Sequence, residues 1–255
     1  MSIVVHIPHA GIQIPASERQ AYTVSPGELD AEMLRMTDHY TDELFGVQHD
    51  LIASVVFPWS RLLVDPERFR KDTQEPMAAR GMGAIYTRTS FGEPLRDEPS
   101  PDERERLLRA YYDPHHAAFE AAVGAALDRD DRCLIVDAHS FPSIALPCDM
   151  DQASDRPEIC IGTDAFHTPA YLAEAAAGMF RDDFWITEVN RPYAGAIAPM
   201  RWYGRDRRVD SIMIEVNRAT YMDETTGAKL PGFDDAKSAL QTCLGQIIGY
   251  WSDHF

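Results

Sequence analysis

Three apolar runs in this chain each lead into a side chain that can take part in catalysis. The side chains are His9, His139 and Glu215, which lie far apart in the sequence. Continuous runs of Val, Ile and Leu are typical of buried parallel strands, and open α/β sheets bind ligands beyond the carboxyl ends of such strands. We therefore expect the three side chains to meet at one edge of a sheet. Two imidazoles and a carboxylate at such an edge predict a metal-assisted hydrolase.

Other polar residues near these strands are expected to support the site. Asp137 lies two residues before His139, so both side chains point to the same face of a strand. A carboxylate behind a metal-binding histidine would fix its tautomer. His6 lies three residues before His9 and is expected on the opposite face, in a structural or supporting role. The histidine pair at 115–116 could supply further ligands, although we favour a place beside the cleft or an aromatic helix face.

The strand pattern does not identify the third metal ligand. Zinc in a catalytic site usually takes three protein ligands and one water, so an acid or another histidine is needed. The charged segment 37–43 offers four candidates, namely Asp38, His39, Asp42 and Glu43. The residue types and their spacing do not choose among the four.

The residues around these side chains alternate between strand-like and helix-like patterns. Apolar runs predict strands at residues 3–7, 51–57, 133–137, 158–161, 185–189 and 211–216. Helical spacing predicts helices at residues 26–44, 101–126, 169–180 and 236–251, with a break near Thr37 and a kink or break at Pro114. The alternation predicts a three-layer α/β sandwich, with a mixed, mostly parallel sheet and helices on both faces. We expect a single domain over residues 1–255.

Two serines mark helix starts, and one long segment lacks regular patterns. Ser25 with Glu28, and Ser100 with Glu103, have the spacing of a capping box with a proline at the first helical position. Residues 58–100 hold many Pro, Gly and Arg and show little periodicity. We interpret this segment as a long excursion over the sheet edge, which is usually functional or mobile.

The composition limits the partners. The chain has 255 residues and a formal charge of −17, so nucleic acid and anionic membranes are poor partners. It contains no 18-residue apolar run, no signal-peptide pattern and no CxxC pair, so we expect a cytoplasmic protein without a transmembrane helix. The motifs G-x-S-x-G, G-x-G-x-x-G and HExxH and the P-loop are also missing, which disfavours serine hydrolases, dinucleotide and nucleotide binding, and zincins.

Several short motifs together resemble the N-formylglutamate amidohydrolase family. The matching segments run in the family's order from the first strand to near the last helix: residues 6–11, 37–42, 58–61, 112–116, 137–140, 190–195, 203–204 and 215–224. Each segment is short, but the ordered set is specific, and the last segment is the strongest. The resemblance implies an α/β fold similar to those of the zinc exopeptidases, such as the zinc carboxypeptidases, and of aspartoacylase.

The resemblance also implies roles for individual residues. A single divalent ion, Zn²⁺ by preference, would be held by His9, Asp38 and His139. The resemblance thus selects Asp38 from the candidates that the segment itself leaves open. Glu215 would be the general base. Arg218 lies just past the strand that carries Glu215, and it would stabilise the oxyanion as the second catalytic residue.

The implied substrate is a small acidic N-acyl amino acid. The family reaction is the hydrolysis of N-formyl-L-glutamate to L-glutamate and formate, which belongs to histidine degradation. Arginines are expected to hold the substrate carboxylates, because a guanidinium binds them in bidentate fashion. The expected substrate-binding residues are Arg61, Asn190, Arg191, Tyr193, Gly195 and Arg201. Each of these arginines could instead form a surface ion pair in so acidic a chain.

The chain departs from the family pattern at three places, of which those at Pro66-Glu67 and Ala196 leave the substrate open. The chain has Ala10 where the family commonly has Ser, Pro66-Glu67 where it often has Leu-Asn, and Ala196 where a second glycine is usual. The alternatives are a zinc hydrolase of other N-acyl amino acids and a carboxypeptidase or peptidoglycan amidase on the same scaffold. A non-catalytic binding protein is a further alternative, but a binding module needs no general base. The oligomeric state is not indicated by the sequence.

Overall fold

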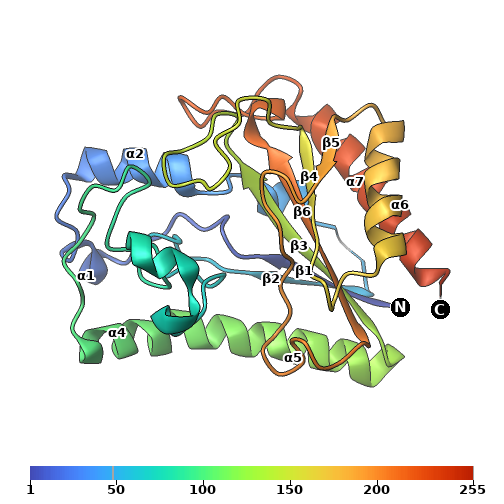
Figure 1. The fold of residues 1–255 in the computed structure, drawn as a ribbon, viewed down its shortest axis with the longest axis horizontal. Helices are drawn as coiled ribbons and strands as arrows, with labels where there is room; N and C mark the ends of the chain where they lie inside the picture. Colours follow the sequence, from blue (N-terminus) through green and yellow to red (C-terminus); the bar gives the residue numbers. More distant parts are fainter. Residues whose placement is uncertain (48, 255) are drawn as a thin grey trace.

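A six-stranded sheet with helices on both faces forms the centre of the computed structural model, which describes residues 1–47 and 49–254 (Figure 1). The strand order is β2-β1-β3-β6-β4-β5. The strands are β1 (Ser2–Ile7), β2 (Ile52–Val56), β3 (Cys133–Phe141), β4 (Ile159–Gly162), β5 (Thr187–Val189) and β6 (Val209–Asn217). In the described residues only β4 against β6 is antiparallel. The prediction of a mixed, mostly parallel sheet is confirmed.

The helices make the outer two of three layers. Helix α5 (Asp113–Asp130) packs against the face of the sheet that carries Val4. Helices α6 (Ala170–Asp182) and α7 (Phe233–Ser252) pack against the face that carries Val5. Val4 and Val5 point to opposite faces because side chains alternate along a strand. Figure 1 shows α5 along one side of the sheet and α6 with α7 along the other.

The first helical region is interrupted where the sequence predicts it. Short helix α1 (Ala16–Arg19) is followed by α2 (Pro26–Met36), which begins with the predicted capping box of Ser25 and Glu28. The backbone at Thr37 is extended, and the next helix is α3 (Thr41–Leu44). The break near Thr37 is confirmed, and it frees the following residues from helical geometry.

The long helical region before β3 is disturbed just before Pro114. Helix α4 (Pro101–Leu107) begins after Ser100, whose side chain accepts a hydrogen bond from the Glu103 backbone N–H. A π-helical turn over Leu108–Tyr112 then joins α4 to α5. The ring of Pro114 would clash with the carbonyl four residues earlier in a regular α-helix, and the wider turn relieves this clash.

Residues 58–100 form a packed part of the protein and not a loose excursion over the sheet. The segment contains two 3₁₀ helices, η1 (Asp72–Gln74) and η2 (Pro76–Arg80). Its side chains build a second apolar core, in which Leu62, Val64 and Tyr86 are fully buried. In the described part of the chain, no helix combines the length and apolar character needed to cross a membrane.

Candidate metal centre

The three predicted strands bring their polar residues to one edge of the sheet. Strands β1, β3 and β6 are parallel neighbours, and His139 lies directly beside Glu215 in the register of β3 and β6. Both strands continue past these residues, to Phe141 and Asn217, so the two side chains belong to strand ends and not to the loops that follow. His9 lies two residues beyond the end of β1. The expected meeting of the three residues is therefore observed.

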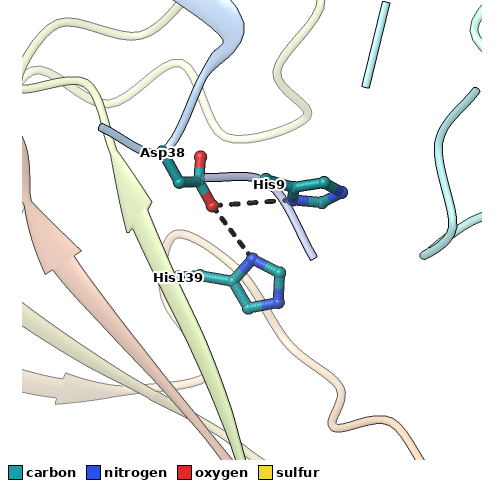
Figure 2. A group of neighbouring side chains, drawn as sticks. All are labelled: His9, Asp38 and His139. Atoms are coloured by element: carbon teal, nitrogen blue, oxygen red, sulfur yellow. Dashed lines mark hydrogen bonds and ion pairs between the residues drawn. The ribbon is translucent and has the colours of Figure 1, made fainter. Parts of the chain in front are cut away.

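Asp38 lies between the two histidines. Its backbone N–H donates to the carbonyl of His9 at 3.0 Å, which holds the turn after α2 against the turn after β1. The carboxylate oxygen Oδ2 lies 3.0 Å from Nδ1 of His139 and 3.5 Å from Nδ1 of His9 (Figure 2). All three side chains are buried. The fold thus selects Asp38 from the four candidates of its segment by one non-local contact.

A second carboxylate lies behind each histidine. Nε2 of His9 lies 2.8 Å from Oδ1 of Asp65, and Nε2 of His139 lies 3.1 Å from Oδ1 of Asp137. When each ring donates its Nε2–H to an aspartate, both Nδ1 lone pairs point toward Asp38. Metal-binding histidines are usually held by such a carboxylate, which fixes the tautomer.

The cluster fits a divalent ion on two grounds. Nδ1 of His9 is buried and has no hydrogen-bond partner within residues 1–47 and 49–254, and a buried nitrogen without a partner is costly. Ligands about 2.0–2.2 Å from a tetrahedral zinc ion lie roughly 3.3–3.6 Å from one another. The separations of 3.0 and 3.5 Å around Asp38 are close to this range. Two imidazoles with one carboxylate are also a donor set that suits zinc.

The charges around the cluster keep Asp38 ionised. Burial opposes ionisation, but the hydrogen bond from His139, the close approach of His9 and the charge of Arg218 hold the pKa of Asp38 well below its usual value. Nη2 of Arg218 donates to Oδ1 of Asp38 at 2.9 Å, so the other oxygen remains directed at the histidines. Burial lowers the pKa of His139, but Asp137 and Asp38 outweigh this effect and raise it well above normal. In the absence of a metal ion, a proton on the His139 ring supplies the positive charge that the ion would otherwise provide.

Glu215 has the properties of a proton acceptor near neutral pH. Its side chain is buried beside His139, and its Oε2 has no hydrogen-bond partner in the described residues. Burial, with a further contribution from the charge of Asp38, raises the pKa of Glu215 to about 8, against the opposing charges of His139 and Arg218. A bound cation would lower this pKa again toward neutrality. A carboxyl in this range can both accept and donate a proton during a reaction.

These residues open into a cavity of about 470 Å³. Four arginines line it, Arg35, Arg61, Arg68 and Arg218. Among the predicted site residues, the wall also contains His9, Asp38, His139, Asn190, Tyr193 and Glu215. The cavity is large enough for a small amino acid derivative, and its arginines could hold carboxylates.

Three residues predicted to bind substrate are not in the cavity wall. Arg191 forms ion pairs with Asp155 at 2.6 Å and Glu188 at 2.5 Å. The guanidinium of Arg201 is 66% exposed and lies 3.4 Å from a carboxylate on α5. Gly195 has a φ of 114°, which L side chains rarely adopt, so its part is in the turn of the backbone.

Several residues of the site were not found by sequence reasoning. Asp65 and Arg68 flank Pro66 and Glu67, and no local pattern in the sequence marks them as site residues. Nε of Arg68 is buried without a hydrogen-bond partner in the part of the chain described, and its nearest acidic oxygens lie 3.7 and 3.9 Å from the guanidinium. Arg156 lies behind the wall, where it donates to Asp149 at 2.7 Å and to the Tyr193 hydroxyl at 3.3 Å.

His6 lies on the same side of the sheet as the site and not on the opposite face as predicted, although its contacts fit the predicted supporting role. Its Nδ1 lies 2.9 Å from Oδ1 of Asp137, and its Nε2 lies 2.9 Å from Nε2 of His115. The prediction is wrong because β1 ends at Ile7, so the strand alternation does not extend to His9. His116 bonds the carbonyl of Pro66 at 2.9 Å. The pair at 115–116 therefore supports the walls of the site.

Two solved structures share the fold of this chain. An N-formylglutamate amidohydrolase from Ralstonia eutropha JMP134 has a TM-score of 0.84 at 24% identity, over 99% of this chain and 95% of that chain. The gene product Atu2144 from Agrobacterium tumefaciens has a TM-score of 0.66 at 17% identity, over 96% of this chain and 91% of that chain. No match was found among curated proteins. Residues 1–222 match the N-formylglutamate amidohydrolase family, and the chain belongs to that family.

Proposed function

We propose that this protein is a metal-dependent deformylase that hydrolyses N-formyl-L-glutamate to L-glutamate and formate. The observation that carries this proposal is the placement of Glu215, a buried carboxyl with a free oxygen, beside two histidines whose Nδ1 atoms face Asp38. Most buried polar groups in folded proteins have a hydrogen-bond partner, so a buried free carboxylate oxygen beside this cluster favours a role in catalysis. Family membership supports hydrolysis of an amide bond. We also propose that residues 1–255 act as one domain.

His9, Asp38 and His139 would hold the ion through Nδ1, Oδ2 and Nδ1. A bound divalent ion polarises the formyl carbonyl and lowers the pKa of water in contact with it. Asp65 and Asp137 keep the two imidazoles in the tautomer that presents Nδ1. We propose Zn²⁺, because the donors mix imidazole with carboxylate.

Glu215 would move the protons of the reaction. Its free Oε2 accepts a proton as the oxygen of water attacks the formyl carbon, and it delivers this proton to the amine as the carbon–nitrogen bond breaks. The products are formate and the free amino acid. The Arg218 guanidinium is fixed by Asp38 and by the Ser140 hydroxyl, at 2.9 and 3.2 Å. Its positive charge would stabilise the oxyanion beside the ion.

The substrate carboxylates would be held by arginines of the cavity. Arg61 donates two hydrogen bonds to Oδ2 of Asp65, from Nε at 3.2 Å and from Nη2 at 2.9 Å, so its charge is largely satisfied. Arg68 has no comparable partner and a buried free Nε, so it is the better anchor for an acidic side chain. Asn190 and Tyr193 lie in the opposite part of the wall and are proposed to bind the rest of the substrate.

A second candidate substrate class is suggested by Glu67, which also lines the cavity. An acidic wall group repels a substrate carboxylate and attracts a cationic or neutral side chain. The protein would then be a deacylase for other N-acyl amino acids. The departure at Glu67 from the family's usual Asn therefore needs a direct test of substrate charge.

A matched panel of N-formyl amino acids tests the proposal. N-formylglutamate and N-formylglutamine differ by one charge at almost the same size, and N-formylleucine provides an apolar comparison. A hydrogen bond to a charged group contributes about 1.5–3 kcal/mol, so we expect kcat/KM for the glutamate substrate to be roughly 10–100-fold higher. Formate release should also require zinc. Equal or reversed kcat/KM values would exclude a dedicated carboxylate pocket and favour the second class.

A further inference from the structure

A second group of metal-ligating side chains lies next to the first. His6, Glu67 and Asp137 each place a ligand atom within 4.8 Å of the others. Nδ1 of His6 lies 2.9 Å from Oδ1 of Asp137 and 3.3 Å from Oε1 of Glu67. His6 and Asp137 are fully or almost fully buried, and the Glu67 side chain is 18% exposed. None of the three belongs to the ligand set of the first group.

The spacing of this group matches that of the first group. Around Asp38 the two short separations are 3.0 and 3.5 Å, and around His6 they are 2.9 and 3.3 Å. The longer separation in each group lies in the range of roughly 3.3–3.6 Å expected between ligands of one tetrahedral ion, and the shorter one is a hydrogen bond to a ring nitrogen. One imidazole with two carboxylates is a donor set for a divalent transition ion.

Hydrogen bonds within this group do not satisfy both oxygens of the Glu67 carboxylate. Oε1 of Glu67 is buried and makes no hydrogen bond within the described residues, although it faces the His6 ring. The other oxygen, Oε2, lies 3.8 Å from Nε2 of His139. A buried carboxylate oxygen without a donor is unfavourable, and a cation between it and the ring would satisfy it.

The His6 ring is held in an orientation suited to metal binding. Its Nε2 lies 2.9 Å from Nε2 of His115, so one ring must donate to the other. When His6 donates through Nε2–H, its Nδ1 keeps a lone pair for an ion. This is the arrangement that Asp65 and Asp137 impose on the first two histidines.

We propose that His6, Glu67 and Asp137 form a second divalent-metal site, distinct from the His9–Asp38–His139 site. The ion reaches it from the cavity, because Glu67 lies in the cavity wall. Asp137 connects the two sites, since its Oδ1 also lies 3.1 Å from Nε2 of His139. An ion bound to Asp137 would therefore also affect His139, the proposed ligand of the first site that this carboxylate orients.

Metal stoichiometry tests the proposal without reference to any substrate. The full chain is stripped with a chelator, reloaded with excess Zn²⁺, dialysed and analysed for zinc per chain by mass spectrometry. We expect about two ions per chain in the wild type and about one in Glu67→Gln, because the amide removes the anionic donor. Asp38→Asn should also retain about one ion, held at the second site.

Control variants separate ligand loss from misfolding. Glu98→Gln removes one exposed carboxylate of the same type and should keep the wild-type number of ions. Glu67→Asp, which keeps the charge on a shorter side chain, should bind the second ion more weakly than the wild type but more tightly than Glu67→Gln. Far-ultraviolet circular dichroism establishes that each variant is folded. Saturation of the wild type at about one ion, or the same stoichiometry in folded Glu67→Gln, would overturn the second site.

Discussion

Replacing Glu215 by Gln should stabilise the metal-free protein while it removes most of the activity. The side chain is 7% exposed, and Oε2 has no hydrogen-bond partner in residues 1–47 and 49–254. Burial raises its pKa from 4.5 to about 8, with Asp38 acting in the same direction and His139 and Arg218 acting against it. An ionised carboxylate in this position is therefore unfavourable for folding, which is expected of a group kept for catalysis.

The size of the effect follows from the two pKa values. Between pH 4.5 and about 8 the folded state binds more protons at Glu215 than the unfolded chain does. The free energy of unfolding therefore falls as pH rises through this window, and the penalty is complete above it. Each pKa unit corresponds to about 1.4 kcal/mol, which sets an upper value on the order of 5 kcal/mol for the penalty at pH 9.

The Gln amide should recover only part of this penalty, because its own polar atoms also lack partners. We expect Glu215→Gln to gain roughly 1–3 kcal/mol over the wild type at pH 9, or about 2–10 °C in Tm for a chain of this size. The gain should disappear near pH 4, where the wild-type carboxyl is protonated in both states. Calorimetry of the metal-stripped proteins at both pH values measures this difference, with Glu98→Gln as the control.

The activity should change in the opposite direction. With zinc bound, Glu215→Gln keeps the shape of the side chain but cannot accept a proton, so kcat should fall by roughly 10²–10⁴-fold. KM should change less, because the proton moves in the transition state. Zinc content measured on the same preparation separates loss of catalysis from loss of metal. A fully active, metal-loaded variant, or a Tm difference that is the same at both pH values, would refute the reasoning.

Three further substitutions test the neighbours of Glu215. His139→Ala should lower both zinc content and activity, because it removes one of three ligands, and full zinc occupancy with normal turnover would exclude His139 from the site. Asp65→Asn should weaken zinc binding by roughly 10–100-fold in a chelator competition, because the carboxylate that orients His9 is lost, and an unchanged Kd would contradict this role. Arg68→Met should raise KM for N-formylglutamate by roughly 10-fold or more while N-formylglutamine is affected less. An equal rise in KM for both substrates would show that Arg68 contributes to the shape of the cavity but does not recognise the charge of the substrate side chain.

The sheet could be predicted from the sequence because its signals are local. The apolar runs that lead into His139 and Glu215 are long and uninterrupted, and buried parallel strands require such runs. The capping box at Ser25 and the break near Thr37 are also local, and both are confirmed. The meeting of the three strand ends then followed from the rule that parallel strands share an edge.

The remaining parts of the site depend on contacts that the sequence does not reveal. Asp38 is distinguished from the other charged residues of its segment by non-local contacts with the His9 backbone, His139 and Arg218. Arg191 and Arg201 were candidates because of the motifs around them, but nearby carboxylates hold them outside the cavity wall. With 41 acidic against 24 basic residues, most arginines in this chain have an acidic group within reach. Charge alone therefore does not show which arginine remains free.

The two histidines proposed to bind the metal ion are positioned by different means, and this explains why segment 58–100 is packed. Asp137 belongs to the same strand as His139, so the pleat of β3 aligns the two side chains. His9 follows the end of its strand and has no such neighbour. Its orientation depends on Asp65, which is fixed by Tyr86 at 2.6 Å and by Arg61 at 2.9 Å. The apolar core of segment 58–100 therefore keeps Asp65 in place, and Asp65 orients His9, which the sheet itself does not hold. For this reason the irregular segment needs a core of its own.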